Sequence, residues 1–231
     1  MILEASSIHT HYGSSHILFG ISIGVDDCET VCLLGRNGAG KTTTLKSIIG
    51  LVRPSAGSIK FEGVDLAGKS VDGIARMGIG FVPEDRRIFG DMTVLENLEV
   101  AYSGNRKRWI LDDAYDLFPV LRHRAKWPGV SLSGGEQQML AIARTLMTNP
   151  KLLLLDEPAE GLSPIVLQDL TEAMYKLQEK GIAVLLAEQR TEFALKLSRR
   201  AYILEKGMIR YEGSIEELRE NAEVRRKYLA V

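Results

Sequence analysis

Residues 35–42 combine glycines, a lysine and a threonine in a pattern that binds phosphate. The segment reads Gly35-Arg36-Asn37-Gly38-Ala39-Gly40-Lys41-Thr42 and matches G-x-x-x-x-G-K-[ST], with Thr43 following. In such a loop the glycines let backbone N–H groups surround phosphate oxygens, while the lysine reaches the terminal phosphates and the threonine hydroxyl ligates Mg²⁺. We therefore predict a nucleoside triphosphate site here, and we disfavour an unrelated glycine turn.

A second group of chemically useful residues follows an apolar run. Leu152–Leu155 is followed directly by Asp156 and Glu157. A buried strand delivers its last side chains to the edge of the sheet where ligands bind in α/β proteins. We expect Asp156 to hold Mg²⁺ through water or the Thr42 hydroxyl, and Glu157, on the opposite side of the strand, to polarise the attacking water as general base. A surface acidic pair is the weaker interpretation.

A second glycine turn begins about ninety residues after Lys41. It reads Leu132-Ser133-Gly134-Gly135-Glu136-Gln137, and Ser133 with Glu136 three residues later has the order of a capping box at a helix start. The N-terminus of a helix attracts anions. Since one nucleotide needs one P-loop, this turn indicates a second nucleotide, another subunit, or chance.

Tyr12 is an aromatic residue in an early turn. Its ring offers a face on which adenine could stack, which we favour over a surface filler.

The elements that must position these residues follow from hydrophobic periodicity. Alternating residues predict antiparallel strands at 2–8 and 17–25, and an apolar run predicts a strand at Thr30–Leu34 before the loop and a helix at Lys41–Ile49. Later strands alternate with helices, which predicts a parallel α/β sheet. The predicted strands are Ser58–Phe61, Ile79–Val82, Leu152–Leu155, Ala183–Ala187 and Ala201–Leu204, and the predicted helices are Pro164–Glu179 and Thr191–Leu197.

Two further regions are predicted to be helical. One helix spans Thr93–Tyr102 and another runs from Ser133 to about Met147, while short terminal helices cover 216–218 and 224–229. We therefore expect a single domain over 1–231, with a mostly helical subdomain at about 88–147 and a helical tail at about 214–231.

Composition excludes several classes of protein. The chain has 231 residues, 45% apolar and 26% charged, with a net charge of −1 and pI of about 6.5. Its apolar runs are too short for a membrane span, and its charge disfavours nucleic acid as a partner. Cys28 and Cys32 are too few for a disulfide framework, so we interpret them as reduced core thiols.

Taken together, these motifs resemble the ATP-binding subunits of ABC transporters from Leu3 to the carboxyl terminus, and 132–137 looks like their signature sequence. The resemblance implies the ABC ATPase fold: a P-loop core with a parallel sheet, an antiparallel β subdomain and an inserted helical subdomain. It also implies ATP and Mg²⁺ as ligands. In that family two subunits pair head to tail, so Leu132, Ser133, Gly134, Gly135 and Glu136 would contact the ATP held by the other subunit.

The resemblance also assigns roles by position. Glu157 corresponds to the catalytic base and Tyr12 to the adenine-stacking aromatic, and 158–163 corresponds to the D-loop. Glu84, in Val82-Pro83-Glu84-Asp85, stands at the Q-loop position, where we expect it to ligate Mg²⁺. Gln189 stands at the switch-histidine position, where it would donate a hydrogen bond to the γ-phosphate but carry no proton.

Several variants narrow the resemblance to LivF-type subunits of branched-chain amino acid importers, a group that includes relatives serving urea and short amides. They are Val82-Pro83-Glu84, Glu188-Gln189, Met92–Leu98, Glu160–Pro164 and Val224–Leu229. The implied partners are a second ATPase subunit, a membrane permease that inserts a helix at 86–127, and an external solute-binding protein, with the chain on the cytoplasmic side of the membrane. For Arg86 and Arg87 a solvated charged face is equally favoured.

Two other functions are weighed against this one. A soluble ABC ATPase acting on nucleic acid or ribosomes is disfavoured because the spacing from Lys41 to Leu132 leaves no room for a long coiled coil and the chain has one such domain. A P-loop kinase would leave the second glycine turn unexplained.

Overall fold

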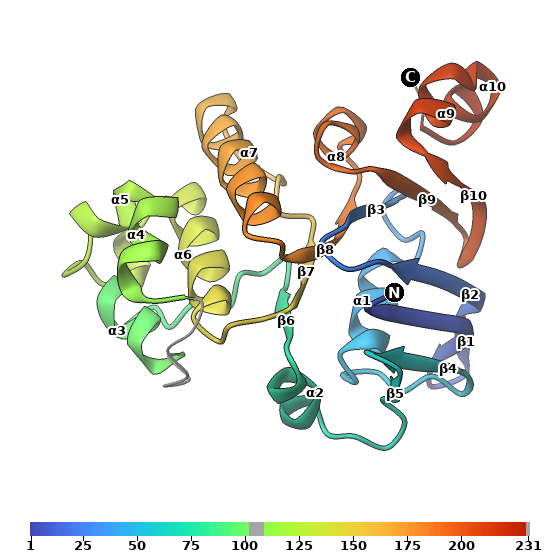
Figure 1. Ribbon diagram of the computed structural model, residues 1–231, viewed down its shortest axis with the longest axis horizontal. Helices are drawn as coiled ribbons and strands as arrows, with labels where there is room; N and C mark the ends of the chain where they lie inside the picture. The colour runs from blue at the N-terminus through green and yellow to red at the C-terminus, as the bar shows by residue number, and fades with distance from the viewer. Residues whose placement is uncertain (102–108, 230–231) are drawn as a thin grey trace.

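The protein is built from two β-sheets and a group of helices at one end (Figure 1), and the computed structural model describes residues 1–101 and 109–229. The smaller sheet is antiparallel in the order β2-β1-β4-β5. Its strands are β1 (Leu3–Tyr12), β2 (Ser15–Val25), β4 (Ala56–Phe61) and β5 (Val64–Asp65).

The larger sheet has the order β10-β9-β3-β8-β7-β6. Its neighbouring strands are parallel from β9 to β6, and β10 pairs antiparallel with β9. The strands are β3 (Thr30–Leu34), β6 (Ile79–Val82), β7 (Leu152–Asp156), β8 (Ala183–Glu188), β9 (Arg200–Glu205) and β10 (Met208–Ser214).

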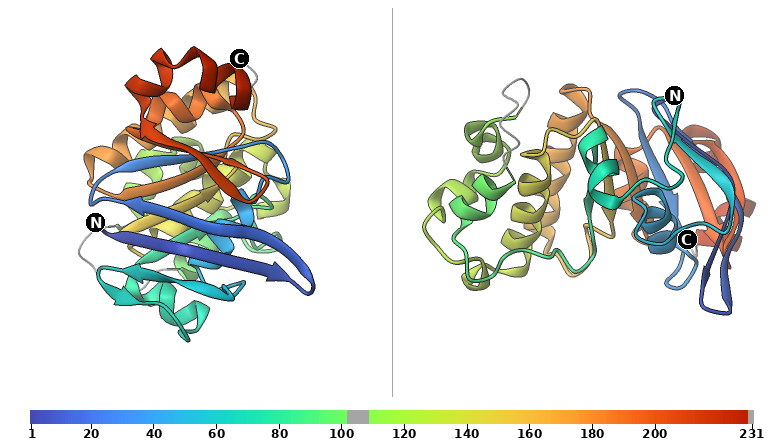
Figure 2. Two further views of the ribbon diagram at one scale, coloured as in Figure 1. Left: turned by 90° about the vertical axis from the view of Figure 1, so that its right-hand side faces the viewer. Right: turned by 90° about the horizontal axis from the view of Figure 1, so that it is seen from below.

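The helices lie mainly on one side of the parallel sheet and beyond its β6 edge. α3, α4 and α5 pack on α6 at the end of the molecule opposite the antiparallel sheet (Figure 2). The helices are α1 (Lys41–Ile48), α2 (Val71–Met77), α3 (Val94–Val100), α4 (Leu111–Leu117), α5 (Pro119–His123), α6 (Gly134–Leu146), α7 (Pro164–Glu179), α8 (Thr191–Leu197), α9 (Ile215–Glu220) and α10 (Ala222–Val224), followed by a π-helical turn at Arg225–Leu229.

The parallel sheet is buried on both faces, which explains its continuous apolar runs. Within β3, Cys32 and Leu34 contact the core formed with the helices, whereas Val31 and Leu33 contact the core shared with the antiparallel sheet and α1. The leucines of β7 alternate in the same way. None of the helices in the described ranges is long and apolar enough to cross a membrane.

Most predicted elements are confirmed, and four of them have the predicted bounds: 30–34, 79–82, 164–179 and 191–197. The capping box of α3 is present, with Thr93 as N-cap, but residues 102–108 of the predicted helical region and 230–231 of the predicted tail lie outside the described residues. α2 was not predicted. Cys28 is exposed, so the prediction of a core thiol is correct only for Cys32.

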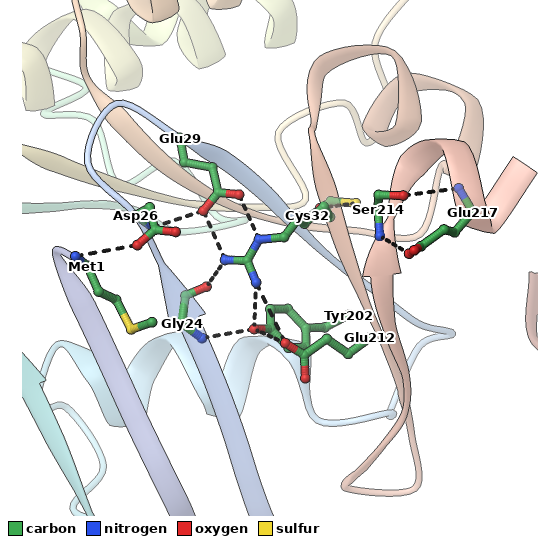
Figure 3. Close-up of polar contacts among 10 residues, drawn as sticks. Met1, Gly24, Asp26, Glu29, Cys32, Tyr202, Glu212, Ser214 and Glu217 are labelled. Carbon is green, nitrogen blue, oxygen red and sulfur yellow. Dashed lines mark hydrogen bonds and ion pairs between the residues drawn. The ribbon is translucent and has the colours of Figure 1, made fainter.

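Arg200 joins the two sheets through a partly buried polar network (Figure 3). Its Nε and Nη2 contact Glu29 Oε1 and Oε2 at 2.7 and 2.9 Å, and Nη2 also donates to the Gly24 carbonyl at 3.0 Å. Tyr202 accepts from Gly24 N–H and donates to Glu212. Burial favours a raised pKa for Glu29, but hydrogen bonds from Arg200 and the Asp26 backbone outweigh it and lower the pKa. The folded state therefore favours the carboxylate.

We expect Arg200→Gln to lower the free energy of unfolding at pH 7 by about 2–4 kcal/mol, because Glu29 would remain buried without its bidentate partner. The stabilisation from Glu29 is complete above its ordinary pKa and is lost as the pH falls through the lowered value, so the effect should shrink below about pH 4. Urea unfolding at several pH values measures both. Arg199→Gln, which changes an exposed neighbour, is the control. An equal loss of unfolding free energy in both variants would contradict the assignment of this stabilisation to the contact between Arg200 and Glu29.

Candidate functional site

The loop at 35–40 connects β3 to α1 in a conformation that requires glycine at two positions. Gly40 is the N-cap of α1 with φ of 113°, and a Cβ there would lie 2.8 Å from Leu18 Cδ2. A Cβ on Gly35 would lie 2.6 Å from the Leu204 carbonyl oxygen. The loop therefore packs directly on β2 and β9, which fixes the start of α1.

Lys41 turns its ammonium group into the loop. The side chain is 3% exposed, and Nζ donates to the carbonyls of Gly35 at 2.8 Å and Arg36 at 3.2 Å. Nζ also forms an ion pair with Glu157 Oε1 at 2.9 Å. The predicted phosphate ligand and the predicted general base are thus in direct contact.

A cavity of about 370 Å³ opens beside this pair. It is lined by Ile17, Asn37, Gly38, Gly40, Lys41, Thr42, Thr43, Glu84 and Glu157. The fold thus brings together the loop, Glu84 and Glu157 from distant parts of the sequence.

Asp156 and Thr42 form a second contact at the same edge. Thr42 Oγ1 donates to Asp156 Oδ1 at 3.0 Å, while Asp156 Oδ2 is buried with no hydrogen-bond partner among the described residues. Burial, together with the nearby Glu157 and Glu84, raises the pKa of Asp156 to about 6 against the hydrogen bond from Thr42. A buried unpaired carboxylate oxygen, a hydroxyl and a neighbouring carboxylate are the hard oxygen donors that suit Mg²⁺.

Glu157 follows β7 with a strained backbone, and its position on the side of the strand opposite Asp156 stays a prediction. Its φ is 47°, a left-handed conformation that breaks the alternation after β7, and its N–H donates to the Ala187 carbonyl at 2.9 Å. The Glu157 carboxylate contacts Lys41 and the Asp156 carboxylate contacts Thr42, the first two residues of α1. Such strain in a non-glycine residue is typical of functional sites.

The β1–β2 hairpin contributes a residue that sequence reasoning missed. Ile17 lines the cavity, whereas Tyr12, at the end of β1 and 46% exposed, is not among its lining residues. The available signal was the hairpin itself: Tyr12 pairs with Ser15, so Ile17 follows closely on the facing strand. Gln189 and Arg36 are exposed and also lie outside the cavity lining.

The second glycine turn caps α6 as predicted. Ser133 Oγ accepts from Glu136 N–H at 3.3 Å, and Glu136 Oε2 accepts from Ser133 N–H at 2.8 Å. Glu136 also pairs with Arg124 at 3.2 Å, so its carboxylate is occupied by contacts within the chain. Ser133 and Gly134 are exposed while Leu132 is buried. The Ser133 hydroxyl retains its own proton for an external acceptor.

The turn does not line the cavity beside Lys41. It packs instead against α7, because a Cβ on Gly135 would lie 2.7 Å from Val166 Cγ1 and 2.9 Å from Cγ2.

The segment after Glu84 is held by two residues that the sequence analysis did not select. Asn97, fully buried in α3, accepts from Phe89 N–H and donates to the Phe89 carbonyl, both at 2.9 Å. Arg144 of α6 donates to the Arg87 carbonyl at 2.6 Å. The sequence signal for Asn97 was the presence of an asparagine in the apolar face of a predicted helix. These bonds connect the Glu84 segment to the helical region.

Arg86 and Arg87 have different surroundings. Arg86 donates from Nε to Gln138 Oε1 at 3.2 Å, whereas Arg87 is exposed and pairs with Asp85 at 2.9 Å. The prediction of a solvated charged face suits Arg87, whereas Arg86 contacts Gln138 of α6.

Comparison with known proteins supplies an independent finding. The sequence model of the ABC transporter family matches residues 18–160. The chain is 42% identical to the high-affinity branched-chain amino acid transport ATP-binding protein BraG of Pseudomonas aeruginosa, over 99% of both proteins. It is 34% identical to a probable branched-chain amino acid transport ATP-binding protein LivF of Archaeoglobus fulgidus, over 95% of both. It is also 36% identical to the lipopolysaccharide export system ATP-binding protein LptB of Haemophilus influenzae, over 99% of this chain and 97% of that protein.

The fold is similar to a solved ATP-binding cassette. The ADP conformation of MJ1267, an ATP-binding cassette of an ABC transporter, superposes with a TM-score of 0.82 at 29% identity, covering 96% of each chain. The predicted fold class is confirmed.

We expect Gly135→Ala to destabilise the protein by about 1–3 kcal/mol through the clash with Val166. Helix propensity alone predicts a gain of about 1 kcal/mol at this position, so the sign of the change separates the two effects. Urea unfolding of Gly135→Ala, Val166→Ala and the double variant gives the coupling between the sites. Additive effects would show that the turn is not packed on α7.

Proposed function

The chain belongs to the ABC transporter family of ATP-binding domains, and from this premise we propose that it energises a membrane importer of hydrophobic amino acids through ATP-driven pairing. It is an ATPase of the ABC type. The importer, its solute and the roles of individual residues are the proposal.

One observation carries the proposal: the chain has two separate glycine-rich turns, and each begins a helix. The P-loop closes around Lys41, and the exposed N-terminus of α6 presents Ser133 outside that cavity. A head-to-tail pair would place each exposed turn against the triphosphate held by the other subunit. This arrangement explains an exposed serine and glycine at a helix start whose capping is already complete.

The contact between Lys41 and Glu157 suggests how the site responds to ATP. Phosphates that bind Lys41 compete with Glu157 for the same ammonium group. Displaced from Lys41, the Glu157 carboxylate is available to polarise a water near the γ-phosphate. Binding and activation of the base are thereby linked.

Mg²⁺ would be held by Thr42, Asp156 and Glu84, and it supplies charge neutralisation for the phosphates when bound. In the same proposal Tyr12 stacks on adenine, and the backbone of 35–40 with Thr43 completes the phosphate contacts. Gln189 donates a hydrogen bond to the γ-phosphate but does not transfer a proton, because an amide does not titrate near neutral pH.

An apolar groove supports a membrane permease as partner. A cavity of about 440 Å³ lies between the P-loop core and the helical region, and Leu51, Phe89 and Val100 around it are 45%, 49% and 58% exposed. We assign it to one helix of the permease, because transport ATP-binding relatives span the whole chain and an amphipathic helix suits such a groove. The peripheral position on the cytoplasmic side of the membrane follows from this assignment.

The solute is inferred from relatives. BraG and LivF favour branched-chain or other hydrophobic amino acids, with an external solute-binding protein as a further partner. LptB, at 36% identity, favours a second candidate in which the chain energises lipopolysaccharide export. Uptake of labelled leucine by cells with and without the gene separates the two; unchanged uptake would reject the amino acid importer.

We expect Ser133→Arg to reduce ATP hydrolysis by about a hundredfold or more while nucleotide binding persists, because the added side chain blocks only the anion site for the partner's ATP. ATPase assays and binding of a fluorescent ATP analogue measure the two quantities, with Lys41→Ala as the control that loses binding. Joint loss of binding and hydrolysis in Ser133→Arg would make the turn structural within its own chain.

We expect Val100→Glu to reduce co-purification with the permease by about tenfold or more, since the charge would be buried in the apolar groove. Val64→Glu, 47% exposed on the antiparallel sheet, is the matched control. Equal co-purification of both variants would exclude the groove as the docking site.

A further inference from the structure

Glu188 is a buried carboxylate to which the proposed function gives no role. It ends β8 and is 1% exposed. Its Oε1 accepts from Ala159 N–H at 2.9 Å, and its Oε2 accepts from the N–H groups of Gln189 at 3.1 Å and Arg190 at 3.0 Å. One side chain therefore binds two segments that are about thirty residues apart in the sequence.

Arg190 completes the contact from the other side. Its Nη1 donates to the Ala159 carbonyl at 3.2 Å, so both polar backbone groups of Ala159 are held by the residues on either side of Gln189. Ala159 lies two residues after Glu157, in the D-loop segment 158–163. We call the contacts of Glu188 and Arg190 with Ala159 the Ala159 clamp.

The backbone of Glu188 also contacts the P-loop. The Glu188 carbonyl accepts from Gly35 N–H at 3.3 Å, and the preceding Ala187 carbonyl accepts from Glu157 N–H at 2.9 Å. The end of β8 thus contacts the start of the P-loop, the base and the D-loop segment.

We propose that Glu188 and Arg190 are positioning residues that make Gln189 and the D-loop segment move as one unit. The inference rests on the proposed function, in which Gln189 contacts the γ-phosphate and the D-loop segment faces the paired subunit. A displacement at Gln189 is then transmitted through the Ala159 clamp to Glu157 in its own site and to the site on the partner.

The electrostatics of Glu188 agree with a functional rather than a stabilising role. Burial, together with the nearby Glu157, raises the pKa of Glu188 to about 7 against the backbone hydrogen bonds that lower it. The Cys32 thiol of β3 also lies close enough to interact with Glu188, while the Arg190 guanidinium is bonded to the Ala159 carbonyl. The folded-state pKa lies above the ordinary value of 4.5, so protonation favours the folded state.

Stability and activity should therefore respond in opposite directions to pH. As the pH falls through about 7, the contribution of Glu188 to folding improves, while the protonated carboxyl loses the charge that holds three N–H groups. A residue that only stabilises the fold would lose activity and stability together.

The test uses the purified full-length chain and its Glu188→Gln variant. We expect kcat for ATP hydrolysis to fall about tenfold with KM changed less than about twofold, because the P-loop contacts remain while the base is misplaced. Hydrogen exchange should accelerate in peptides covering 157–163, and the acid limb of the kcat profile should move from about pH 7 to lower pH, where Asp156 titrates. Glu192→Gln, an exposed glutamate in the adjoining helix, is the matched control and should behave as wild type.

A second variant keeps the inference testable if Glu188→Gln does not fold. Arg190→Gln removes the exposed half of the clamp without altering a buried charge, and we expect the same direction of change in kcat and exchange. Unchanged kcat and exchange in a folded Glu188→Gln or in Arg190→Gln would overturn the inference. Glu157→Gln, assayed alongside, separates this failure from failure of the proposed function: if Glu157→Gln still hydrolyses ATP, the assignment of the base itself is wrong.

Discussion

The whole site depends on one constraint of the parallel sheet: the carboxyl ends of β3, β8 and β7 lie side by side at the same edge. The P-loop follows β3, Gln189 follows β8, Asp156 is the last residue of β7 and Glu157 comes after it. The first and last of these segments are more than a hundred residues apart in the sequence. Parallel pairing fixes their register, with Leu34 beside Glu188 and Asp156 beside Ala187. β8 occupies the middle position, which is why its last residues contact both neighbours.

Negative charge is concentrated at this edge and needs cations to be balanced. Asp156, Glu157 and Glu84 lie close together beside Thr42. Burial and the repulsion among these carboxylates raise the pKa of Asp156 to about 6. The pKa of the exposed Glu160 in the D-loop segment is raised as well, by desolvation and by Glu157 and Glu84. Lys41 neutralises only one of these carboxylates. An anionic nucleotide can approach such a surface favourably only together with a divalent cation, so the two ligands should bind cooperatively.

The sequence was sufficient where structure is determined by neighbouring residues. The buried strand at 30–34, the P-loop and the capping boxes of α3 and α6 depend on local patterns, and each was predicted at or near its observed bounds. The failures have non-local causes or weak local signals. α2 is short and contains Gly73, which lowers its helix propensity, and the left-handed backbone at Glu157 is supported by a hydrogen bond to Ala187 of the neighbouring strand. Ile17, Asn97 and Arg144 act through contacts between elements that are distant in the sequence. The hydrophobic periodicity of the sequence does not predict such contacts.

The proposed pairing requires the chain to hold the P-loop and the turn 132–137 in a fixed relation. Two connections do so here: the Glu84 segment is bonded to Asn97 and Arg144 in the helical region, and the signature turn packs through Gly135 on Val166 of α7, which follows the D-loop segment. The first connection ends on α3 and on the last turn of α6, and the second ends at the turn 132–137 itself. Because the turn is capped within its own chain, the proposed pairing need not fold it, and under the same proposal the energy of ATP binding would be available to move the helical region and the apolar groove beside it.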